Sequence, residues 1–154
     1  MANIPGLSGD TVANSGLALK WLDILSGTTY TGLGTTYVQL HNGQPGFTGL
    51  ANPSLCYTVG SANTARKTLA WTGATNSPST NVATKAISGT PSWTGWDSGT
   101  DGITHVSVWV GSATAGAGTF LFSAALTGGT KTVNNGDTLN LTALSLTLTP
   151  TTGS

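Results

Sequence analysis

Charge is what this sequence has least of. Only 6% of its 154 residues are charged, and 5 Lys and Arg residues balance 5 acidic residues at a formal net charge of zero. An ordinary soluble domain carries about 25% charged residues. Every acidic residue is an aspartate, because the sequence contains no glutamate. So few cations can neutralise few phosphates, which argues against nucleic acid and against an anionic membrane surface as partners.

Other absences exclude further classes. The single cysteine, Cys56, rules out an internal disulfide and a multi-cysteine zinc site. No apolar run approaches the roughly 20 residues of a transmembrane helix. The segment Met1–Asp10 has no basic stretch before an apolar block, so we expect no secretory signal. Without glutamate, a Gly-x-Ser-x-Gly elbow or a phosphate-binding loop, we expect no catalytic residues and no cofactor.

Residues 1–35 differ from the rest and are expected to form an arm, a short helix and a linker. Asn14 is a favourable N-cap and Gly27 a favourable C-terminal stop. Between them Leu17, Trp21 and Leu25 recur at every fourth position, which predicts an amphipathic helix over residues 15–26. Its apolar face must pack on the same subunit or on a neighbour, so these three side chains are candidate assembly contacts.

Residues 36–154 are expected to form one β domain, because the period changes to two. Alternating runs separated by turn pairs such as Asn42-Gly43 and Asn135-Gly136 predict short strands. About eight such strands indicate an all-β, antiparallel sandwich, jelly-roll-like in character. The expected strands are residues 36–41, 67–72, 81–88, 104–110, 119–126, 138–141 and 144–149.

Two groups of polar residues invite a chemical interpretation. His41 and His105 could hold a metal or act as acid and base together with Asp97 or Asp101. Their spacing matches no ligand pattern, so structural roles are favoured. The run from Asp97 to Gly102 hints at a calcium loop but lacks the terminal glutamate, and a β-turn is favoured. We therefore expect no metal site.

The five tryptophans are the strongest remaining signal. Trp71 is expected in the core. Trp109 lies opposite a run of valines and is expected at an interface or rim. Trp93 and Trp96 could present two indoles on a loop for stacking on a surface ligand, with core filling as the alternative.

A series of short segments carries a resemblance over roughly residues 37–149. They are residues 37–46 (YVQLHNGQPG), 65–67 (ARK), 103–109 (ITHVSVW), 124–126 (AAL), 135–139 (NGDTL) and 144–148 (LSLTL). In this order they resemble a family of small proteins of tailed bacteriophages, particularly those of actinobacteria. Its members are labelled head decoration, minor tail or tail fibre proteins.

The resemblance implies a virion structural protein with no catalytic residues, made in the host cytoplasm and located on the particle surface. The first expectation is a capsid decoration protein, a homotrimer that binds the major capsid protein and stabilises the shell. The alternative is a tail fibre or tail-tip module that contacts other tail proteins and a host surface glycan. Neither role involves nucleic acid or a membrane.

Overall fold

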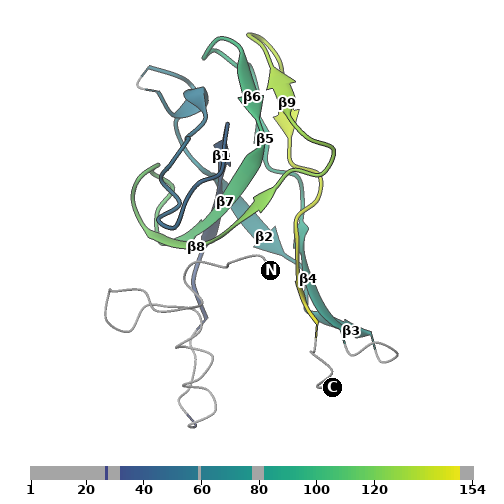
Figure 1. Ribbon diagram of the computed structural model, residues 1–154. Coiled ribbons are helices and arrows are strands. Elements are labelled where there is room, and N and C mark those ends of the chain that lie inside the picture. Colours follow the sequence, from purple (N-terminus) through teal and green to yellow (C-terminus); the bar gives the residue numbers. More distant parts are fainter. Residues whose placement is uncertain (1–26, 28–31, 59, 78–81, 150–154) are drawn as a thin grey trace.

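The computed structural model describes residues 27, 32–58, 60–77 and 82–149. Over these residues the chain forms short strands and one 3-10 turn (Figure 1). In chain order they are β1 (Thr36–His41), η1 (Leu55–Tyr57), β2 (Lys67–Trp71), β3 (Thr75–Ser77), β4 (Val82–Ser88), β5 (Ser92–Trp93), β6 (Asp101–Ile103), β7 (His105–Val110), β8 (Thr119–Ala125), β9 (Lys131–Val133), β10 (Leu139–Asn140) and β11 (Ser145–Leu148).

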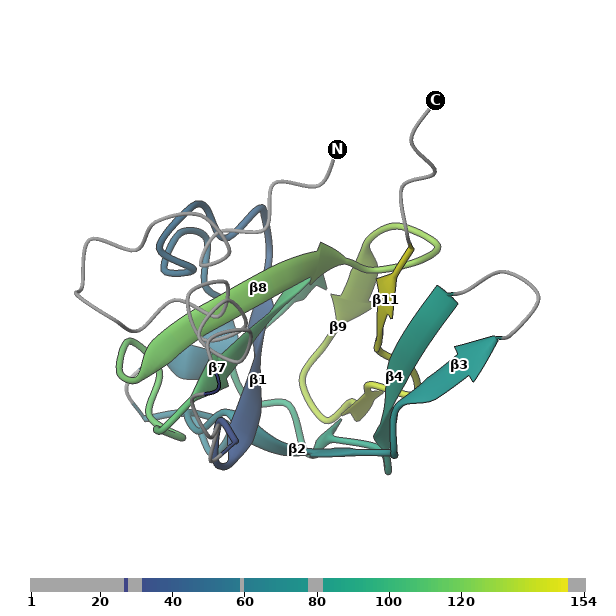
Figure 2. The ribbon, with the colours of Figure 1, turned by 90° about the horizontal axis from the view of Figure 1, so that it is seen from below.

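One seven-stranded antiparallel sheet forms the framework. Its order is β11-β4-β2-β1-β7-β8, and β3 pairs with β4 beside β2. β1 and β7 pair over six residues, from Thr36 opposite Val110 to His41 opposite His105. A register shift at Val108/Trp109 interrupts the pairing of β7 with β8. Figure 2 shows that the sheet curls rather than lying flat.

Two small sheets, β10-β5 and β6-β9, complete the sandwich. Their residues Trp93, Ile103 and Val133 join one core cluster with residues of the large sheet. The large sheet contributes apolar residues that alternate along β1 and β7, together with Leu69 and the consecutive pair at the β8 irregularity: Val38, Leu40, Leu69, Val106, Val108, Leu121 and Phe122. The period of two in the sequence therefore becomes a shared core between layers.

The expected all-β, antiparallel sandwich is confirmed. The structure contains each of the expected strands, with bounds shifted by at most one or two residues. It adds β3, β5, β6 and β9, which are two or three residues long and too short to show alternation. The expected helix over residues 15–26 lies outside the described residues.

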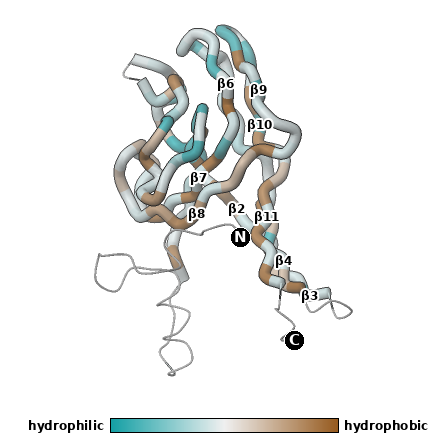
Figure 3. Tube along the Cα trace, viewed as in Figure 1, coloured by the Kyte–Doolittle hydropathy of each residue, from teal (hydrophilic) through white to brown (hydrophobic). Residues whose placement is uncertain are grey.

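The body has two chemically different ends. β1 begins and β11 ends at one end of the molecule, beside the β3–β4 ribbon, and the turns that follow β5 and β9 lie at the other (Figure 1). Apolar residues lie along β4 and β11, whereas the far turns are hydrophilic (Figure 3). Among the described residues, no helix is long and apolar enough to cross a membrane.

Candidate functional site

The two candidate ligand-stacking tryptophans are core residues. Trp93 is 0% and Trp96 1% exposed. The expectation of two exposed indoles is therefore wrong. The reason is topological: β5 pairs with β10 and the following turn is bonded to the 134–138 turn, so both rings face inward. Neither indole N–H has a hydrogen-bond acceptor.

Trp109 is also buried within its own chain, at 3% exposure, so the interface or rim position expected for it is wrong. Arg66 covers it, with the guanidinium carbon 3.8 Å from the ring centroid. Phe120 packs beside it at 5.3 Å between centroids. The guanidinium also donates to the side-chain oxygen of Gln39 and to the carbonyls of Ser112 and Ala117. Burial lowers the pKa of Arg66 to about 10, so it stays charged at neutral pH.

His41 belongs to a buried hydrogen-bond relay. The Trp109 indole N–H donates to the Ser107 hydroxyl oxygen at 2.7 Å. That hydroxyl lies 2.7 Å from Nε2 of His41, and Nδ1 of His41 lies 2.9 Å from the Ala51 carbonyl. Since a carbonyl only accepts, Nδ1 carries the proton and Nε2 accepts from Ser107. Burial lowers the pKa of His41 to about 4. A neutral, fixed imidazole of this kind holds the 42–53 loop in place.

The carboxylates of Asp97 and Asp101, which the sequence offered as acid–base or metal-binding groups, also form hydrogen bonds that hold loops together. The Asp101 carboxylate accepts from the Ser54 hydroxyl and the Leu55 amide, both at 2.7 Å. The Asp97 carboxylate accepts from the Ser61 hydroxyl and the Ala62 amide, which lower its pKa. The two aspartates thus anchor different loops. In the described part of the chain, no three His, Cys or Asp side chains are grouped to hold a metal.

Cys56 is fully buried beside Ser54, and burial raises the pKa of its thiol to about 11. A thiol in this state is an inert packing group. Trp71 is half-buried against the core and donates to the Thr36 hydroxyl at 2.7 Å. The candidate assembly contacts Leu17, Trp21 and Leu25 lie outside the described residues, and their role stays a prediction.

Sequence reasoning missed an exposed apolar loop between β1 and η1. Phe47 is 76% and Leu50 48% exposed. The loop is tightly built: the Asn52 side-chain amide donates to the Gln44 carbonyl, and Ala51 N–H donates to the Pro45 carbonyl. Phe47 is therefore held in an exposed position on a well-defined loop. In the sequence, the only sign of an apolar surface here was that Phe47 and Leu50 lie three residues apart.

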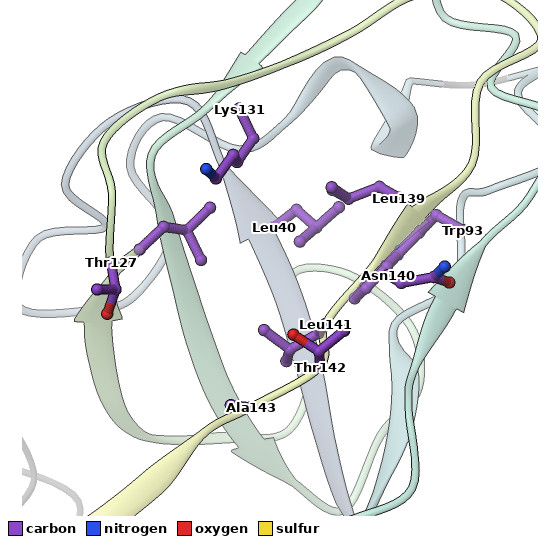
Figure 4. A pocket seen from close by; sticks show the side chains of 10 residues that line it. Leu40, Trp93, Thr127, Lys131, Leu139, Asn140, Leu141, Thr142 and Ala143 are labelled. Carbon is purple, nitrogen blue, oxygen red and sulfur yellow. The ribbon is translucent and has the colours of Figure 1, made fainter.

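A second feature without a sequence signal is a pocket between the layers (Figure 4). Its volume is about 190 Å³. Leucines from β1, from the end of β8 and from the β10 segment form the interior, and Trp93 contributes to its wall. Thr127, Asn140 and Thr142 also belong to the lining, and among the described residues Lys131 is the only charged one there. The lining comes from five separate segments of the chain, namely β1, β5, the end of β8, the start of β9 and residues 139–143, so only the fold brings them together.

The polar end of the body is built from three turns bonded to one another. Gly99 N–H donates to the Asn135 side-chain oxygen at 2.9 Å, and the Thr100 hydroxyl donates to that of Asn134 at 3.1 Å. The Asp97 carboxylate joins the third turn through Ser61. Residues 60–64, 94–100 and 134–138 thus form one rigid hydrophilic surface, called here the polar loop end.

A family model described as podophage GP4 fiber I protein gp80 matches residues 13–149. The chain belongs to this family. It is accordingly a structural protein of a bacteriophage virion. The matched region includes every strand of the structure and extends into the segment before β1 that carries Leu17, Trp21 and Leu25. No curated protein matches the chain.

Proposed function

We propose that this protein is a component of the phage tail fibre or tail tip, and that it does not decorate the capsid shell. The observation that carries the proposal is the match of residues 13–149 to a family described as a fibre protein. The match spans the whole β domain, so the similarity covers the body of the protein and is not limited to a segment that attaches it to the particle.

The two-ended body supports a place in an appendage. The described chain enters β1 and leaves β11 at the apolar end, whereas the polar loop end faces away from it (Figures 1 and 3). An apolar end with the exposed Leu148 suits contact with other protein, because apolar burial drives association. The polar loop end suits a surface that faces water.

We further propose that the role is adhesive and mechanical rather than catalytic. Three of the side chains that could do acid–base or nucleophilic chemistry, His41, Cys56 and Asp101, are buried and hold loops together. The proposed partners are copies of this chain, as a trimer, and other tail proteins. The expectation that neither nucleic acid nor membrane is a partner rests on the low charge of the chain.

The position of the protein in the particle tests the proposal. Antibodies raised against the β domain are applied to intact virions and located by immunogold electron microscopy, with antibodies to the major capsid protein as the control. We expect gold at the tail and none on the shell. Gold distributed over the shell would overturn the tail assignment and restore shell decoration.

A further inference from the structure

Phe47 is the most exposed of the large apolar side chains in the described part of the chain, at 76%. The loop that carries it, residues 42–53, contains no charged residue. The loop is closed by the Ala51 N–H, which donates to the Pro45 carbonyl at 2.9 Å, and Gly49 lies so close to the rings beneath it that no Cβ would fit. The phenyl ring is therefore held in place in water, and its burial against a partner would cost little ordering of the loop.

The pocket between the layers has the size and the lining to receive one aromatic ring (Figure 4). Its volume is about 190 Å³, and an engineered apolar cavity of about 150 Å³ is large enough to bind benzene. The apolar lining comes from Leu40, Leu126, Leu139 and Leu141. Among the described residues the one charge in the lining is Lys131, and an ammonium group is attracted to the face of an aromatic ring. Size, apolar lining and charge all suit a phenyl ring.

The exposed ring and the pocket belong to opposite faces of the large sheet. Leu40 lines the pocket and packs in the core, whereas the next residue, His41, points to the other face, because side chains alternate along a strand. On that face His41 bonds to the Ala51 carbonyl of the loop that carries Phe47. Figures 1 and 2 show the loop on one side of the body and the β8–β9 turn, which borders the pocket, on the other. Phe47 therefore cannot reach the pocket of its own chain, and the two can meet only between copies.

We propose that Phe47 of one copy inserts into the pocket of a neighbouring copy, with its ring among the leucines and against the Lys131 ammonium. The inference rests on the proposed function, in which copies of this chain associate, and names the two surfaces that meet. One contact removes both an exposed phenyl ring and an open apolar pocket from water. Because ring and pocket lie on different faces, the contact is head-to-tail, and such contacts form closed rings when the rotation between copies closes. A ring of three copies uses every Phe47 and every pocket.

Sedimentation velocity of the full chain at concentrations up to about 1 mM measures self-association, since a contact built around one aromatic anchor is weak. Phe47→Ser removes the ring, and Thr142→Trp places a bulky side chain in the lining of the pocket. Both positions are exposed, so the fold should persist, which amide NMR spectra check. We expect the wild-type chain to associate and each variant to associate about 10- to 100-fold more weakly. Leu55→Ser removes another exposed apolar side chain, outside the loop and the pocket, and should leave association unchanged.

Mixing the two variants tests whether the ring and the pocket meet each other. The ¹⁵N-labelled Phe47→Ser chain keeps its pocket, and the unlabelled Thr142→Trp chain keeps its ring. On mixing we expect amide shifts in residues 126–131 and 139–143 of the labelled chain. The unlabelled Phe47→Ser/Thr142→Trp double variant is the matched control and should cause none. Sedimentation of the mixture should show dimers and no larger species, because each pair of chains retains one intact contact.

Three results would overturn the proposal: a wild-type chain that stays monomeric at about 1 mM, a Phe47→Ser chain that associates as strongly as the wild type, or a mixture that gives no shifts at the pocket. The first result would leave the pocket to a different protein, and the second would assign the contact to another surface of this chain. None of these measurements depends on where the protein sits in the virion. Failure here is therefore distinct from failure of the tail assignment, which the gold labelling decides.

Discussion

At the scale of single residues, this protein uses buried polar and charged side chains to hold its strands and loops together. Arg66 joins β1 to the loop that precedes β8 while stacking on Trp109. His41 joins β7 to the exposed apolar loop through Ser107 and Ala51. Both ring nitrogens of His41 are hydrogen-bonded, whereas Arg66 is bonded through Nε and Nη1 and its buried Nη2 has no hydrogen-bond partner among the described residues. Hydrogen bonding is the condition under which a buried polar side chain stabilises a core.

The buried histidine predicts a pH dependence of stability. The folded pKa of His41 is about 4, below its ordinary value of 6.5. The unfolded chain therefore binds a proton between these values that the folded chain excludes. Stability is full above pH 6.5 and falls as the pH drops toward 4, by about 3 kcal/mol in total.

Urea unfolding at a series of pH values measures this loss. NMR titration of a His105→Gln variant, in which His41 is the only histidine, assigns it to the correct group. A His41 that titrates near 6.5 in the folded state would contradict the structure.

Substitution of Gly49 is expected to cause a steric clash in addition to the backbone strain that any side chain meets at a positive φ. Its φ is +72°, and a Cβ there would lie 2.5 Å from Phe120 and 2.8 Å from Trp109. We expect Gly49→Ala to destabilise by about 2–4 kcal/mol, from backbone strain and overpacking together. Gly129→Ala is the control, because its φ is +78° and its Cβ would meet nothing within 4 Å. It should cost only about 1–2 kcal/mol. Equal melting temperatures for the two variants would refute the close approach.

At the scale of elements, strand length decided what could be predicted. β1, β7 and β8 each span six or seven residues, enough for a period of two to be visible. β3, β5, β6 and β9, which the sequence did not predict, span two or three residues and are defined by their pairing with a partner strand. The sequence predicts a turn at Asp101. In the structure Asp101 is the first residue of β6, because it pairs with Val133 of β9.

The β3–β4–β11 ribbon predicts a gradient of local stability. None of its strands contains a fully buried residue, whereas β1 and β7 are buried over most of their length. Local opening is easiest where buried apolar contacts are few. We expect amide hydrogens of β3 and β11 to exchange early and those of β1 and β7 to exchange last, measured by hydrogen–deuterium exchange with NMR detection. Equal protection of β11 and β7 would contradict this order.

At the scale of the whole molecule, the low charge predicts how the protein is held in the particle. With 5 positive and 5 negative residues, contacts with neighbours must come mainly from uncharged surface. At about 1 M salt the Debye length is roughly 3 Å, so charge-based contacts weaken, whereas apolar contacts persist.

We therefore expect virions washed in about 1 M salt to retain the protein and urea to release it, as measured by gel analysis of pelleted particles. A virion protein of the same particle with a strongly charged sequence serves as the control. Release by salt alone would show that the few charges dominate the contacts.

The amino-acid sequence by itself determined the class of fold, the domain that carries it and the absence of a recognisable catalytic pattern. These follow from local periodicity, turn residues and composition, which each segment expresses without its neighbours. Tertiary structure alone decided that Trp93, Trp96 and Trp109 are buried, that Phe47 is exposed, and that Leu40 of β1 lines a pocket together with Trp93 and residues 139–143. Burial depends on which element covers which, and a pocket depends on residues far apart in the chain. Neither property can be predicted from the spacing of residues that are neighbours in the sequence.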